Sequence, residues 1–143
     1  MKKNIILVTL SIILGITFTF FVLNKQDTYA KEEYLVYAFQ VGAFEKEDNA
    51  IEYSSYLPTS IIHKENNLYK VYVAIYKDID IINKMVVYFE NNDINVYLKN
   101  ISVDKDFYKI LDNYEEFINK SDNDNIYNKI NQSILNSFLE SIK

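Results

Sequence analysis

The chain has 143 residues, enough for one domain and a membrane anchor but not for two full domains. Its net charge is −5, and it contains neither arginine nor cysteine. The acidic balance excludes a nucleic-acid binder, which needs a basic surface. The lack of cysteine excludes disulfides, thiol catalysis, zinc–thiolate sites and lipid attachment through a thiol.

An uncharged run of 19 residues, from Ile5 to Leu23, opens the chain. A helix of this length spans roughly 28 Å, about the thickness of the hydrocarbon core of a bilayer. Lys2 and Lys3 precede the run, so we expect a single-pass helix in the cell membrane with its N-terminus in the cytoplasm. Residues 1–33 are then a cytoplasmic stub, an anchor at about 5–23 and a short linker. The alternative is a signal peptide cleaved near Ala30, which would release a secreted protein.

Alternating side chains predict strands over residues 34–44 and 68–76, with a short strand at 61–64 between them. In the first strand, the alternation places Leu35, Tyr37, Phe39 and Val41 on one face. A helix is expected over residues 46–57, because acidic residues stand at its start and Pro58 follows it.

Asp78 can cap a second helix that runs to about residue 91, and a last strand is expected at about 95–103. The predicted order is therefore β-α-β-β-α-β, an α+β fold in which two helices cover one face of an antiparallel sheet. The other face is left open, and it carries Gln40, Lys70 and Tyr72.

Residues 104–143 are predicted to form a C-terminal helical hairpin. Apolar side chains recur at helical spacing from Phe107 to Ile118. A polar loop follows, and a second apolar series comprises Ile126, Ile130, Ile134, Phe138 and Ile142. The apolar stripe of such a hairpin must be buried against something. One option is that the hairpin folds back over the open sheet face.

The only glycine after the apolar N-terminal run is Gly42. It lies in the strand sequence Tyr37-Ala38-Phe39-Gln40-Val41-Gly42-Ala43-Phe44, which is followed by Glu47-Asp48-Asn49-Ala50. The later strand reads Leu68-Tyr69-Lys70-Val71-Tyr72-Val73-Ala74-Ile75-Tyr76. Over residues 34–103 the chain resembles the SPOR domain, a small peptidoglycan-binding module of bacterial division and sporulation proteins. Departures are Ala43 for a serine, Tyr72 for a basic residue, and Ala74-Ile75 for Gly-Pro.

The resemblance implies that Gln40 takes part in glycan binding and that Gly42 and Phe44 belong to the structural motif. On the same face, the rings of Tyr72 and Tyr97 suit the C–H faces of sugars. Lys70 and Lys99 are candidates for pairing with the carboxylates of a glycan strand without stem peptides. For each of these side chains, the alternative is ordinary packing or exposure to solvent.

No arrangement of residues predicts catalysis, a cofactor or a metal site. His63 is the single histidine and is expected to be structural. The resemblance to the SPOR domain, together with the apolar run, implies a non-catalytic, extracytoplasmic protein at a division or sporulation septum that binds peptidoglycan glycan strands. The alternative function is an oligomerisation or protein-interaction module that uses the C-terminal hairpin to contact a partner.

Overall fold

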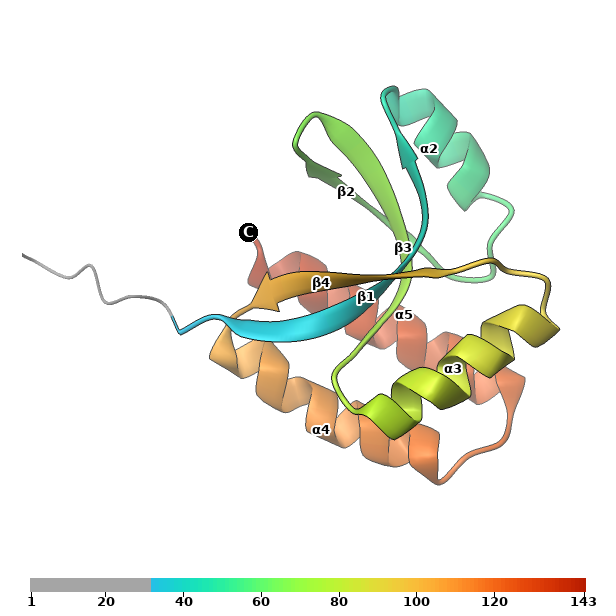
Figure 1. Ribbon diagram of the computed structural model, residues 1–143, viewed down its shortest axis with the longest axis vertical. Helices are drawn as coiled ribbons and strands as arrows, with labels where there is room; N and C mark the ends of the chain where they lie inside the picture. The colour runs from blue at the N-terminus through green and yellow to red at the C-terminus, as the bar shows by residue number, and fades with distance from the viewer. Residues whose placement is uncertain (1–31) are drawn as a thin grey trace, which may run out of the picture. The chain divides into compact units, whose positions relative to one another are not determined.

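The computed structural model describes residues 32–143, which form one compact unit (Figure 1). Its elements, in chain order, are β1 (Tyr34–Phe44), α2 (Glu47–Ser54), β2 (Ile61–Glu65), β3 (Leu68–Tyr76), α3 (Ile79–Asn91), β4 (Tyr97–Val103), α4 (Lys105–Asn119) and α5 (Asp124–Ser141). The predicted order of strands and helices is thus confirmed. The predicted anchor lies outside the described residues. Within residues 32–143, no helix combines the length and the apolar character needed to span a bilayer.

The four strands form one antiparallel sheet in the order β2-β3-β1-β4. The first strand is therefore central, with β3 on one side and β4 on the other. The turn between β2 and β3 contains Asn66 and Asn67 at φ 51° and 62°. Asparagine tolerates this left-handed conformation, which two-residue hairpin turns of this twist require.

The pairing of β1 with β3 is irregular between Phe39 and Gly42, where the register shifts twice. Such bulges bend a strand and break its alternation of faces. The irregularity affects only Val41 among the residues predicted to share a face: the pairing with β4 is regular from Tyr34 to Gln40, so Leu35, Tyr37 and Phe39 do lie on one face, which is unevenly covered. Leu35 is 67% exposed and Tyr37 is 38% exposed, whereas Phe39 is fully buried.

The helix α2 packs on β1, β2 and β3 through its buried residue Ala50. Near it, the rings of Phe44 and Tyr53 lie 5.4 Å apart, so α2 covers the sheet face on which Phe44 lies. The side chain of Asp78 caps α3 as predicted, accepting hydrogen bonds from the next helical N–H groups. From α3, the ring of Phe89 packs against Phe39 at 5.6 Å.

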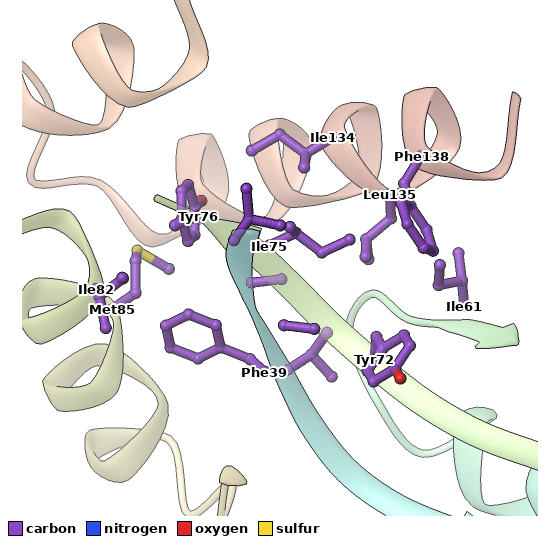
Figure 2. Close-up of a cluster of buried hydrophobic side chains, with 14 of the residues drawn as sticks. Phe39, Ile61, Tyr72, Ile75, Tyr76, Ile82, Met85, Ile134, Leu135 and Phe138 are labelled. Carbon is purple, nitrogen blue, oxygen red and sulfur yellow. The ribbon is translucent and has the colours of Figure 1, made fainter. Parts of the chain in front are cut away.

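The helix α5 packs along β3, as Figure 2 shows for Ile134, Leu135 and Phe138 above Ile75 and Ile61. The ring of Phe138 lies 5.8 Å from that of His63. A hydrogen bond of 2.7 Å from Thr59 to Gln132 joins the loop before β2 to the same helix. The expectation of an open second face is therefore wrong over β2 and β3, because the hairpin folds back onto them.

The buried stripe of α5 differs from the predicted one. Ile134 and Phe138 are buried, but Ile126 and Ile142 are 41% and 43% exposed. A helix advances about 100° per residue, so each step of four residues drifts about 40° around the axis. Ile126 and Ile142 thus lie about 160° apart and cannot share one face. The stripe is completed instead by Tyr127, Asn131 and Leu135.

Candidate functional site

Among the predicted site residues, Tyr72 differs most in the structure from the exposed position expected for it. It is fully buried, and its ring stacks on that of His63 at a centroid distance of 6.4 Å. Among the described residues its hydroxyl has no hydrogen-bond partner. Burial, and then the charge of Glu65, raise the pKa of Tyr72 to about 12. A tyrosine enclosed in this way has no ring face to offer a sugar.

Lys70 lies on β3 opposite Ala43 of β1 and His63 of β2. Its ammonium group forms an ion pair and a hydrogen bond with the carboxylate of Glu65. The side chain is only 21% exposed. A glycan carboxylate would have to compete with Glu65 for this group, so Lys70 is a weak candidate for a ligand contact.

Gln40, Tyr97 and Lys99 are brought together at the β1–β4 edge of the sheet. Gln40 is half-buried and lies opposite Tyr97. Tyr97 is 63% exposed, and the exposed Lys99 follows two residues later, so both side chains point to the same side of β4. Neither Tyr97 nor Lys99 has an ion pair or side-chain hydrogen bond in the part of the chain that the structure describes. We call these three residues the β4 edge site.

Gly42 and Phe44 have a structural explanation. A Cβ atom on Gly42 would lie 2.7 Å from Cε2 and 2.9 Å from Cζ of Phe44. That is closer than carbon atoms can approach, and Tyr53 packs against the same ring. Glycine fits here because the Phe44 ring lies over its backbone, and a larger residue would have to displace that ring from its contact with Tyr53. Positive φ is not the reason, since Gly42 has none.

Two further titratable groups, His63 and Glu115, have structural roles. His63 lies between the rings of Tyr72 and Phe138, in keeping with the structural role expected for it. Glu115 is buried and accepts hydrogen bonds from the backbone N–H groups of Lys77 and Asp78 at 2.7 and 2.9 Å. Burial raises the pKa of Glu115. No group of three or more potential metal ligands occurs within residues 32–143.

The sequence left open whether the C-terminal hairpin packs on the sheet, and the structure shows this contact for α5. The apolar residues of α5 predicted a buried face but not its partner. Thr59 and Gln132, 73 positions apart in the chain, form part of this interface and carry no pattern that would pair them.

Comparisons with known proteins gave one structural likeness. The chain is similar to the peptidoglycan-binding domain of the B. subtilis cell wall lytic enzyme CwlC, solved in solution, with a TM-score of 0.42 and 22% identity. The match covers 49% of this chain and 94% of that domain. No protein-family profile and no curated protein matches the sequence. The function proposed for this chain is therefore based on its own sequence, topology and side chains and not on this likeness.

Proposed function

We propose that residues 34–103 form a non-catalytic module that binds peptidoglycan glycan strands. The supporting observation is the β4 edge site. Its glutamine belongs to the strand whose sequence resembles the SPOR domain, and its tyrosine and lysine are exposed beside it. The five residues expected from the sequence to contact glycan are thereby reduced to three: Gln40, Tyr97 and Lys99.

Each side chain of the β4 edge site has a distinct task in this proposal. The amide of Gln40 offers donors and an acceptor to the hydroxyl and N-acetyl groups of a sugar. The ring of Tyr97 provides a flat apolar surface for the C–H face of a pyranose. The ammonium group of Lys99 attracts a carboxylate that the loss of a stem peptide has freed on the glycan.

The location is a second part of the proposal. We infer that the uncharged run at 5–23 holds the module outside the cell membrane, and that the protein acts at a division or sporulation septum. The support is the apolar run itself, together with the sequence resemblance. A secreted form, released by cleavage near Ala30, is the alternative.

Co-sedimentation with purified cell-wall sacculi tests the binding proposal. The full chain, kept in solution by detergent, is pelleted with sacculi before and after an amidase removes the stem peptides. We expect pelleting to rise after amidase treatment and Tyr97→Ala to weaken it about two- to tenfold. Phe117→Ala, which removes a ring that is also 63% exposed but belongs to α4, is the matched control. Equal pelleting of the two variants would refute the site, and no pelleting of a folded wild type would refute the function.

A second candidate function is self-association through the edge strand β4. Leu35, Tyr37 and Leu98 are exposed on neighbouring positions of β1 and β4, and among the described strands β4 has a partner on one side only. An exposed apolar edge of this kind is a common place for strand addition. A molecular mass that rises with concentration, and falls in Leu98→Lys, would favour this function.

A further inference from the structure

A cavity of about 370 Å³ lies where the loop after α2, the C-terminus of α3 and the N-terminus of α5 meet. Its size falls within the range of small-molecule sites in proteins. We call it the tyrosine pocket; the lining residues that matter to its chemistry are Tyr53, Tyr56, Tyr88, Asp93, Asp124 and Asn128. None of these residues belongs to the β4 edge site, so the pocket's ligand does not depend on the proposed function.

Three tyrosines, Tyr53, Tyr56 and Tyr88, are among the residues that line the pocket. Tyr56 is 78% exposed and Tyr53 is 39% exposed, although each ring has a large apolar surface. Pro58, the single proline of the chain, also lines the pocket and restricts the loop that carries Tyr56. Tyr53, in the last turn of α2, packs on Phe44 on one side, and Tyr56 lies on the restricted loop; together they offer accessible ring surface for stacking against a ligand.

The inner part of the pocket is fixed by hydrogen bonds. Tyr88 is buried, and its hydroxyl donates to Oδ1 of Asn128 at 2.9 Å. Asn92 Nδ2 donates to the carbonyl of Tyr88 at 2.9 Å. Burial, and then the charge of Asp124, raise the pKa of the Tyr88 hydroxyl, so it stays protonated and keeps donating. With its oxygen occupied, Asn128 retains its amide N–H groups for a ligand hydroxyl.

The pocket is also negatively charged. Asp93 and Asp124 line it, and none of the described lining residues is basic. Neither carboxylate forms an ion pair within residues 32–143, whereas the nearby Asp122 is paired with Lys84. Asp93 is held by a left-handed backbone at φ 57°, a conformation that aspartate tolerates and most other side chains do not. Two unpaired carboxylates beside tyrosine rings favour a positively charged ligand and disfavour an anion.

We propose that the tyrosine pocket binds an amino sugar, a pyranose whose amino group is free and protonated. The rings of Tyr53 and Tyr56 stack on the sugar, Asn128 donates to a hydroxyl group, and Asp93 and Asp124 attract the ammonium group. An acetylated sugar has the same ring but no charge, so it binds more weakly.

Titration of the isotope-labelled full chain, followed by NMR, tests this assignment. The detergent should have no sugar headgroup. Glucosamine is the probe, N-acetylglucosamine is the uncharged match, and ethanolamine carries the ammonium without the ring. At up to about 10 mM ligand, we expect glucosamine to shift the signals of the pocket residues. We expect N-acetylglucosamine and ethanolamine each to bind at least about threefold more weakly.

Variants separate the pocket from the β4 edge site. Tyr56→Ala should weaken glucosamine binding about fivefold and Asp124→Asn about threefold, while Phe117→Ala, which removes an exposed ring of α4 outside both sites, leaves it unchanged. Equal binding of the two sugars would overturn the role of the carboxylates. Binding of ethanolamine as tight as that of glucosamine would overturn the role of the rings. The absence of any shift with glucosamine would overturn the site. The NMR titration reports the signals of the pocket residues separately from that of Tyr97, so the two proposals fail independently.

Discussion

Replacement of Phe138 by alanine tests whether α5 packs on the sheet. The restriction of the proposed glycan site to Gln40, Tyr97 and Lys99 depends on this packing. Phe138 is only 3% exposed, and its ring meets those of His63 at 5.8 Å and Phe107 at 5.6 Å. Removing a buried phenylalanine costs about 3–5 kcal/mol of unfolding free energy, from lost burial and from the cavity that remains. With a urea dependence of about 2 kcal/mol per molar, the unfolding midpoint should fall by about 2 M.

The assay is urea unfolding followed by circular dichroism and tyrosine fluorescence, since the chain has no tryptophan. Phe117→Ala is the matched control: this residue of α4 is 63% exposed, so its removal should change stability by no more than about 0.5 kcal/mol. If Phe138→Ala costs less than about 1 kcal/mol, α5 is not packed on the sheet. Tyr72 would then be accessible, and the glycan site would regain the residues assigned to it from the sequence.

Further predictions concern buried polar groups and one surface contact. Tyr72→Phe should leave the unfolding free energy unchanged or raise it, because the hydroxyl of Tyr72 has no partner among the described residues. Tyr76→Phe should lower the unfolding free energy by about 1–2 kcal/mol, because it removes the hydrogen bond to Asn131. Thermal unfolding of the two variants compares these effects. Burial raises the folded pKa of Glu115 above that of the unfolded chain, so the stability this group contributes is full below the unfolded pKa and is lost as the pH rises through the folded pKa. Glu115→Gln should therefore gain stability relative to wild type over that rise, and parallel curves of unfolding free energy against pH would contradict this. Lys84→Ala should lower the unfolding free energy by about 1–2 kcal/mol, because Lys84 donates hydrogen bonds to the carbonyls of Ile118 and Ser121 near the end of α4. The control is Lys129→Ala: the side chain of Lys129 has no such contacts among the described residues, so this change should cost less than about 0.5 kcal/mol.

The strands and the first helices could be predicted closely from local patterns. The expected strands at 34–44 and 68–76 have the same bounds in the structure, and Asp78 caps α3 as its position suggested. These features depend on neighbours within a few residues, through alternation, turn residues and capping. Sequence patterns report such local relations well.

The candidate site was harder to predict because it depends on contacts between distant segments. An amphipathic helix indicates that one face will be buried but not what will bury it. The bulges of β1 lie between Phe39 and Gly42, and no local pattern indicates that Phe39 is buried while Leu35 and Tyr37 are exposed. Tyr72 alternates correctly with its neighbours and is still hidden, because a helix more than fifty residues later covers it.

The central position of β1 has a mechanical consequence. Tension that enters the unit at Tyr34 runs along a strand held on both sides, by β3 and by β4. If the resisting force is applied at Tyr97, opposite Gln40, the hydrogen bonds between β1 and β4 are loaded together in shear and do not open one after another. If such a module joined a membrane to a wall and the two moved relative to each other, the load would pass through the pairing of β1 with β4. In this geometry the strands resist separation, because all their hydrogen bonds share the force.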